Sequence, residues 1–233
     1  TDFTARKGWQ SRVTVAERTA DAHLRSAIEQ AERADQRDLV RQIRLERIAR
    51  FTNAGRLDVA EEERQRLVQS YLEEGTPARA ANVYLDQAHQ LGRDDVERAD
   101  AALEKALGYS DLALEPDRSF LGCTIHTHAA WLHSRQDPVA AVRKYRLAAD
   151  ASQRASGSVP AAVGQELQAR HNAVIVTRRE ADAFDAELRL EVLAEWCSRF
   201  PVAPAEAIPD YLAELRDDAA FAGRFAPLIR AVE

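Results

Sequence analysis

The residues of this chain that could do chemistry gather in one short stretch, where Cys123, His126, His128 and His133 follow one another. Cysteine and histidine are preferred zinc ligands, and Cys123 and His126 would lie one helical turn apart, so they could share an ion. His133 would lie about 10 Å further along the helix axis, too far for the same ion without distortion. Because no spacing signature names ligands on other helices, we predict no bound metal and no cofactor.

The histidines also support an alternative function. His89 on an earlier predicted helix could join His126 and His133 in a pocket. The chain would then be an α-helical ligand- or metal-binding domain, acting as an enzyme or a sensor. His128 points to another side of its helix, and we expect it to be packed and hydrogen-bonded inside the protein.

Catalytic motifs are missing from the sequence. It contains no GxxxxGK[ST], GxGxxG, HExxH or GxSxG, the patterns of phosphate loops, dinucleotide sites, zinc proteases and serine hydrolases. Serine, histidine and aspartate are present, but a catalytic triad is a spatial arrangement that scattered residues do not reveal. We therefore predict that the protein is not an enzyme.

Composition indicates a folded, acidic protein. Of the 233 residues, 45% are hydrophobic and 30% are charged, and the two kinds are interleaved, which is unlike a disordered chain. The net charge of −6 disfavours a nucleic-acid partner, since such partners need a basic surface. Arginine greatly outnumbers lysine, which we attribute to a GC-rich bacterial genome.

Several features favour the cytoplasm. No apolar run approaches the ~20 residues that span a bilayer, so we predict no membrane partner. The first residues, 1–12, are polar and lack the apolar centre of a signal peptide. Cys123 and Cys197 form no CxxC motif, and we expect both to be reduced.

Helical periodicity and its punctuation predict an all-α protein with about 11 helices. Gly55, Gly75 and Gly92 are expected to end helices, and Thr76-Pro77 and Asp137-Pro138 to start them. The expected helices cover residues 13–35, 36–53, 57–74, 76–92, 94–114, 119–135, 137–155, 161–178, 181–199, 205–216 and 217–232. Thr14 would cap the first helix, with Glu17 completing a capping box.

The turns recur at near-regular spacing. Gly55, Gly92 and Gln136 mark turns 37 and 44 residues apart, which indicates stacked helix pairs. Arrays of this kind usually bind partners and rarely do chemistry. The predicted organisation is an N-terminal arm and capping helix over 1–35, helical repeats over 36–199 and a capping hairpin over 200–233.

One segment carries a family resemblance. Ala129 and Leu132 precede the turn at 136–138, and small and aromatic residues follow it at Ala141, Tyr145 and Ala148. With the repeat-ending segment 112–117, this pattern resembles the tetratricopeptide repeat. The resemblance covers about 36–199 and implies antiparallel helix hairpins stacked into a tetratricopeptide-like α-solenoid. The repeats are longer than the usual ~34 residues, and several signature Gly and Tyr positions are missing.

A second repeat register also fits the sequence. Leu67, Tyr71, Gly75, Ala80 and Tyr84 make a good repeat from 61 to 93. In this register the helix over 57–74 would be the first of a pair rather than the second. We prefer the alternating register, in which the helices beginning at 36, 76, 119 and 161 come first.

In the resembled family the first helix of each pair lines a concave face. The residues that this rule selects are Arg79, Asn82, Asp86 and His89, then Cys123, His126, Ala130 and His133, and also Gln42, Leu45, Ala49 and Thr52. Each set follows i, i+3, i+7, i+10 and forms one stripe. The implied function is an interaction module, scaffold or regulatory adaptor that binds a protein or peptide segment. An ordinary solvated face is the competing interpretation.

Two further features have two interpretations each. Arg37, Arg41 and Arg44 form a basic stripe, either a solvated face with weak i,i+4 pairs or a site for an acidic partner. Trp9 either packs on the first helix or docks a partner, including a second copy in a homo-oligomer. Trp131 is expected to pack between repeats, as is Trp196.

Overall fold

The computed structural model describes residues 2–199, with the side chains of 18–159, 161–185, 188–189 and 191–196. Every regular element in this part of the chain is a helix. The helices are α1 Asp2–Arg33, α2 Arg37–Asn53, α3 Leu57–Glu73, α4 Pro77–Leu91, α5 Val96–Ser110, α6 Asp117–His133, α7 Pro138–Ala155, α8 Pro160–Arg179, the 3-10 helix η1 Ala181–Ala183, and α9 Ala186–Arg199. The predicted all-α class is confirmed there, and the helices predicted over 205–232 lie outside it.

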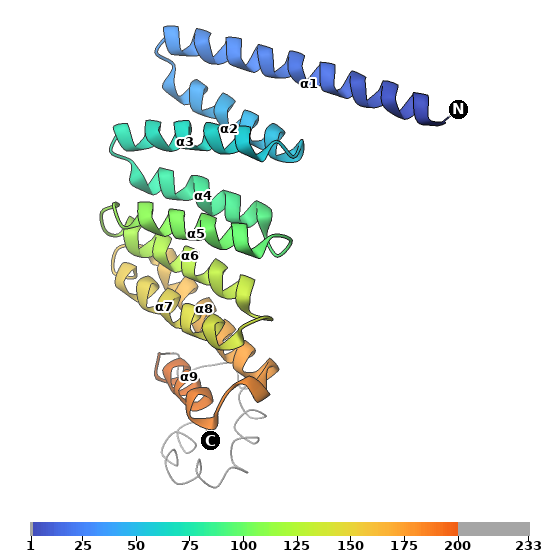
Figure 1. The fold of residues 1–233 in the computed structure, drawn as a ribbon. Coiled ribbons are helices and arrows are strands. Elements are labelled where there is room, and N and C mark those ends of the chain that lie inside the picture. The colour runs from blue at the N-terminus through green and yellow to red at the C-terminus, as the bar shows by residue number, and fades with distance from the viewer. Residues whose placement is uncertain (1, 200–233) are drawn as a thin grey trace. The chain divides into compact units, whose positions relative to one another are not determined.

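The chain forms two compact units, which divide within α4 between Ala80 and Ala81. In the first unit, α2 packs against α1 and α3. In the second unit, α6 packs against α5 and α7, while α8 packs against α6, α7 and α9. Consecutive helices run back and forth within each unit (Figure 1). The packing of successive helices is thus confirmed, and the division at 35 and 199 stays a prediction.

The turns at Gly55, Gly75 and Gly92 lie at the positions predicted from the sequence. Gly55, Gly75 and Gly92 have φ angles of +72°, +68° and +52°, the left-handed conformation that glycine adopts without strain. After Gly55, the N–H of Arg56 donates to the carbonyl of Phe51 at 2.9 Å, which satisfies an acceptor left open by the end of α2.

Carboxylate caps begin α5, α7 and α9 of the second unit. Asp137 accepts a hydrogen bond from the N–H of Ala140 at 2.9 Å, and Pro138 takes the first helical position of α7. Asp95 accepts from the N–H of Arg98 at 3.2 Å to cap α5. Each cap satisfies an N–H that the helix itself cannot pair.

Three predicted helix bounds are wrong. α1 already begins at Asp2, so Thr14 lies inside helical backbone and cannot be its N-cap. α5 ends at Ser110 rather than Leu114, since Leu114 is 82% exposed and offers no burial to hold another turn. The helix predicted over 181–199 is broken at Phe184, whose backbone is extended and whose side chain is buried.

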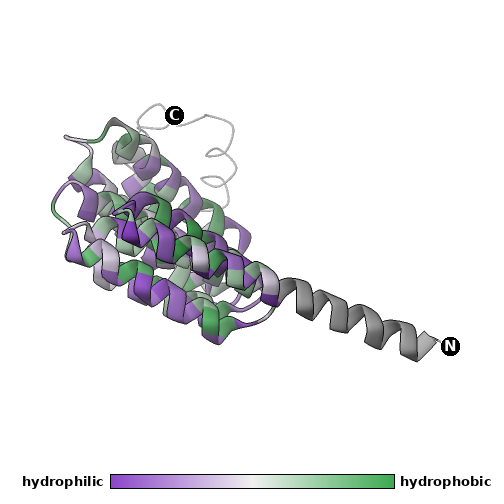
Figure 2. Cartoon of the chain, turned by 90° about the horizontal axis from the view of Figure 1, so that it is seen from above, coloured by the Kyte–Doolittle hydropathy of each residue, from purple (hydrophilic) through white to green (hydrophobic). Residues whose placement is uncertain are grey.

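Small residues build the core of the second unit. Ala130, Ala141 and Ala148 are all fully buried beside Tyr145, which lets helices approach closely while the aromatic ring fills the remaining space. Figure 2 shows hydrophilic and hydrophobic residues mixed along the coloured helices, as expected for helices that have one buried side and one exposed side. Trp196 is buried as predicted.

Candidate functional site

A hollow of about 860 Å³ in the first unit is lined by the end of α1 and by α2 and α3. Charged side chains make up much of its wall, but they pair with one another. Arg44 donates to Glu32 at 3.0 Å, and Arg66 lies 3.9 Å from Glu62. The charged side chains of this wall are therefore paired within the protein, so few of their charges remain to bind a charged ligand.

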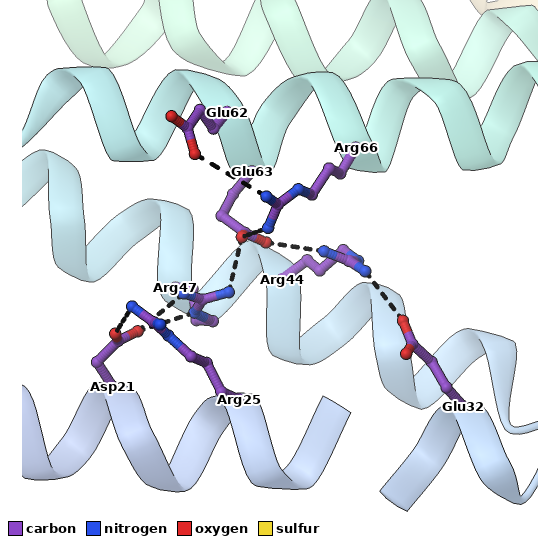
Figure 3. Close-up of polar contacts among 8 residues, drawn as sticks. All are labelled: Asp21, Arg25, Glu32, Arg44, Arg47, Glu62, Glu63 and Arg66. Carbon is purple, nitrogen blue, oxygen red and sulfur yellow. Dashed lines mark hydrogen bonds and ion pairs between the residues drawn. The ribbon is translucent and has the colours of Figure 1, made fainter. Parts of the chain in front are cut away.

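Glu63 of α3 is the centre of this ion-pair network (Figure 3). It is 1% exposed, and one carboxylate oxygen accepts from Arg47 at 2.7 Å and from Arg66 at 2.8 Å. The other oxygen accepts from Arg44 at 2.9 Å. A buried carboxylate needs such partners, because burying it alone would be strongly unfavourable.

The network extends to α1 through Asp21. Arg47 donates to Asp21 at 2.9 Å, and Arg25 lies 2.6 Å from the same carboxylate. Burial alone would raise the pKa of Asp21, but the hydrogen bonds from Arg25 and Arg47 outweigh it and lower that pKa. The four carboxylates and four guanidiniums in Figure 3 carry balancing charges: Asp21, Glu32, Glu62 and Glu63 with Arg25, Arg44, Arg47 and Arg66. We assign the network to holding α1, α2 and α3 together.

Two of the three arginines of the basic stripe on α2, Arg41 and Arg44, are part of this interior, whereas Arg37 is exposed. Arg41 is 6% exposed, donates to Asp38 at 2.9 Å and pairs with Glu74. Its guanidinium carbon lies 5.0 Å from the ring centroid of Tyr71. The expectation of a solvated stripe is therefore wrong for Arg41 and Arg44, because their long side chains cover apolar surface while their charged ends reach carboxylates of other helices.

A pocket in the second unit has a different chemistry. Its volume is about 310 Å³, and its lining comes from α4, α6, α7 and α8. The lining residues are His89, Thr124, Thr127, His128, Trp131, Tyr145, Gln165, Gln168 and Asn172. We call it the amide pocket. None of these is Asp, Glu, Lys or Arg, although such residues are 30% of the chain. Its wall therefore offers neutral hydrogen-bonding groups and aromatic rings, which are groups that orient a ligand in a binding site and give specificity.

Two helices contribute one face each to the amide pocket. Thr124, Thr127 and Trp131 follow i, i+3, i+7 on α6. Gln165, Gln168 and Asn172 repeat this spacing on α8, which places each set on one side of its helix.

His128 is buried against the pocket wall. It is 9% exposed, and its ring centroid lies 4.0 Å from that of His89 and 5.4 Å from that of Trp131. The backbone carbonyl of Ala88 accepts a hydrogen bond from this ring, while Nε2 has no partner in the described part of the chain. We assign the proton to Nδ1, because Ala88 offers a backbone acceptor and Nε2 has none, and Nε2 is then an acceptor.

The ring of His128 is neutral at pH 7. Burial lowers its pKa to about 4, the neighbouring His89 adds to this effect, and the hydrogen bond to Ala88 opposes it. A neutral imidazole has one donor and one acceptor. The prediction that His128 is packed and hydrogen-bonded is confirmed, but one of its two nitrogens is unsatisfied.

Gln165 is a second unsatisfied group in the amide pocket. Its Oε1 atom is buried and has no partner among the described residues. A buried polar atom without a hydrogen bond costs about 1–3 kcal/mol, and native proteins hold few of them. Gln165 and His128 in one pocket point to a ligand that completes their hydrogen bonds.

Trp131 is 40% exposed, so the prediction that it packs between repeats is wrong. The guanidinium carbon of Arg93 lies 4.3 Å from its ring centroid. Arg93 also donates to the backbone carbonyl of Trp131 at 2.8 Å and to Ser134 at 3.1 Å. These contacts fix the indole in place while leaving much of its surface available.

The histidines predicted to share a pocket are separated. His89 lines the amide pocket, whereas His133 Nε2 lies 2.6 Å from Asp100 of α5. His126 lines another hollow, of about 240 Å³ and shared with α5 and α7. Burial lowers the pKa of His126, and the charges of Lys144 and Arg154 lower it further.

The other predicted groove residues divide into exposed and buried ones. Arg79, Asn82 and Asp86 are exposed along α4; Arg79 belongs to the first unit and the other two to the second. Cys123 is 1% exposed and Ala130 is fully buried, so neither side chain reaches a surface. Burial also raises the pKa of the Cys123 thiol.

The sequence-based stripe on α6 lies one residue away from the residues that line the pocket. It ran through 123, 126 and 130, whereas Thr124, Thr127 and Trp131 line the pocket. One residue is a rotation of about 100°. The buried residues of α6 surround most of its circumference: Ser119, Leu121, Gly122, Cys123, Ile125, His128, Ala129, Ala130 and Leu132. The pattern of apolar residues therefore does not show which side of α6 faces the pocket. In the sequence, only the spacing of Thr124, Thr127 and Trp131 could have indicated that side.

Two properties of the described residues bear on function classes. Their His, Cys, Asp and Glu side chains include no group of three or more arranged to hold a metal ion. None of the helices between residues 2 and 199 is both long and apolar enough to cross a bilayer.

Comparison with protein-family models, with curated proteins and with solved structures gives no match to this chain. The function must therefore be inferred from the chemistry of its own surfaces, and the amide pocket is the most informative of them.

Proposed function

We propose that this chain is a protein-interaction module, a scaffold or adaptor of the bacterial cytoplasm, that binds an extended segment of a partner protein or peptide. The binding site is the face of the second unit formed by α4, α6 and α8. The single observation that carries this proposal is the amide pocket, where an exposed tryptophan and two unsatisfied polar atoms meet without any charged side chain.

Helix packing supports a tetratricopeptide-like stack in the second unit. α8 packs against α7 and also against α6, the contact expected between the first helices of consecutive pairs. The amide pocket takes most of its lining from α4, α6 and α8, which are first helices in the alternating register. This supports the proposal that they line one shared face.

The lining chemistry favours recognition over catalysis. The pocket residues offer hydroxyls, carboxamides, imidazoles and an indole, but no carboxylate, amine or thiol beside them. Carboxamide groups on regular helices are held ready to pair with the donors and acceptors of a peptide backbone. Because helices hold these groups before binding, little ordering entropy opposes association.

Selection from a random peptide library tests the proposal. Immobilised protein should enrich a peptide family, and Trp131→Ala should weaken a selected peptide at least about tenfold, or ~1.4 kcal/mol, in calorimetry. Gln168→Ala should weaken it by a smaller factor. Gln136→Ala, in an exposed turn outside the pocket, is the matched control and should bind normally. Failure to enrich any peptide, or binding indifferent to Trp131→Ala, would refute the proposal.

The second candidate is a small-ligand domain, and the size of the amide pocket favours it. About 310 Å³ is enough for a small molecule. Its histidines would be His89 and His128, which lie in ring contact, rather than His89 with His126 and His133. Stoichiometric zinc or iron in purified protein, or a small molecule that co-purifies with it, would favour this candidate.

A further inference from the structure

We propose that the amide pocket selects an uncharged part of the bound segment, whose amide N–H donates to Nε2 of His128, and that it rejects acidic segments. This inference rests on the proposed peptide-binding function and names the chemistry that it recognises.

The hydrogen-bonding role of His128 is set by the backbone of α4. Its bond to the carbonyl of Ala88 occupies one ring nitrogen, and Nε2 stays buried without a partner among the described residues. A nitrogen in this state accepts a hydrogen bond and cannot donate one. The group that completes it must therefore carry an N–H or O–H.

Gln165 adds a second acceptor on the opposite lining helix. Its buried Oε1 also lacks a partner in the described part of the chain. A carboxylate entering the pocket would bring only acceptors to His128 and Gln165, so neither atom would be satisfied. A peptide backbone, or the carboxamide of Asn or Gln, supplies the N–H donors that both atoms need.

The uncharged lining of the pocket disfavours ionised occupants. Two cations act on the lining residue Tyr145, Arg93 and Arg179. Arg93 contacts the ring and carbonyl of Trp131 and Ser134, although its buried Nε has no partner among the described residues. Arg179 donates to Glu180 and to the carbonyl of Ser134. No carboxylate lines the pocket to pair with a lysine or arginine of the segment. An ion placed among the lining residues would lose hydration without a charged lining residue to pair with, which is unfavourable.

Three synthetic pools of ten-residue peptides test this selectivity. They are random except at two central positions, which hold Asn, Gln, Ser or Thr in the neutral pool, Asp or Glu in the acidic pool, and Lys or Arg in the basic pool. Each pool is passed over immobilised full-length protein at pH 7, and retained peptides are counted by mass spectrometry. We expect neutral peptides to be retained at least about tenfold better than acidic ones, or ~1.4 kcal/mol, because an acidic side chain leaves a buried acceptor unsatisfied.

His128→Phe is the central variant, because it keeps a flat ring and removes the acceptor. Retention of the neutral pool should fall to the acidic level. His23→Phe, on an exposed position of α1, is the matched control and should retain the neutral pool normally. If circular dichroism shows that His128→Phe does not fold, Gln165→Leu replaces it, with the same expected loss.

The outcomes separate the two proposals. Equal or better retention of the acidic or basic pool, or normal neutral retention by a folded His128→Phe, overturns this inference. If retention still depends on Trp131 in that case, the proposed binding function stands. Retention of no pool, or retention indifferent to Trp131→Ala, overturns the binding function as well.

Discussion

Four residues that resemble a metal motif have four different environments once the chain folds. Cys123 is buried in the core, His126 lines a hollow beside α5 and α7, His128 borders the amide pocket, and His133 pairs with Asp100. Each residue of a helix is rotated by about 100° from the last. Residues that are close in the sequence of a helix therefore point in different directions, so these four side chains do not form one site.

Protonation of His128 should destabilise the protein in acid. Its pKa of about 4 in the folded state lies below the ~6.5 of an unfolded histidine. Because the unfolded state binds more protons between these values, the contribution is complete above pH ~6.5 and is lost as the pH falls towards 4. We expect His128→Gln to reduce the loss of stability between pH 7 and pH 4 by roughly 3 kcal/mol, measured by denaturant unfolding at both pH values.

His23→Gln, at an exposed position of α1, is the control for the substitution itself and should leave stability at pH 7 nearly unchanged. His126 has a pKa lowered in the same direction, so some dependence should persist in the His128 variant. A His128→Gln curve parallel to that of the unaltered protein would show that the folded state accepts the proton on this ring.

At the scale of elements, local capping explains where α7 begins. Asp137→Ala removes the acceptor for the N–H of Ala140 and should cost about 1 kcal/mol of stability. Thermal unfolding, with hydrogen exchange at the first turn of α7, measures this effect. Gln136→Ala changes the preceding exposed residue, whose side chain does not cap α7, and should be nearly neutral; equal effects of both changes would argue against a capping role.

At the scale of the whole molecule, the two compact units are stabilised in different ways. The first depends on charge, because buried Glu63 bonds Arg44 and Arg47 of α2, and Arg47 also bonds Asp21 of α1. The core of the second combines many alanines with a few large residues, which favours close helix packing, and its buried ion pair joins Arg170 to Glu166 of the same helix. Removing a network charge should therefore affect the first unit selectively.

Glu63→Ala leaves three guanidiniums without their shared carboxylate. We expect a loss of about 3–5 kcal/mol, seen as faster amide hydrogen exchange in α1, α2 and α3 with α6–α8 unchanged. Glu62→Ala is the matched control. The exposed Glu62 lies 3.9 Å from Arg66, and surface ion pairs of this kind contribute at most ~1 kcal/mol to the free energy of unfolding. Equal loss of protection in α6–α8 would instead show that the two units unfold together.

The sequence by itself determined the helical class and most helix ends, because those depend on neighbouring residues. Glycine at 55, 75 and 92 adopts the left-handed backbone, and Asp137 with Pro138 starts α7, through contacts that span only a few positions. These features could be predicted without knowing what packs against each helix.

Only the tertiary structure decided which sides of the helices line the amide pocket and which sides hold neighbouring helices together. The exposure of Trp131, the unsatisfied Nε2 of His128 and the inward pairing of Arg44 all depend on residues distant in the chain. Arg47 and Asp21, for example, are 26 positions apart. An arginine stripe has the same sequence pattern whether it faces water or a buried carboxylate. The loss of hydration and the distance to a partner carboxylate are set only when the helices pack.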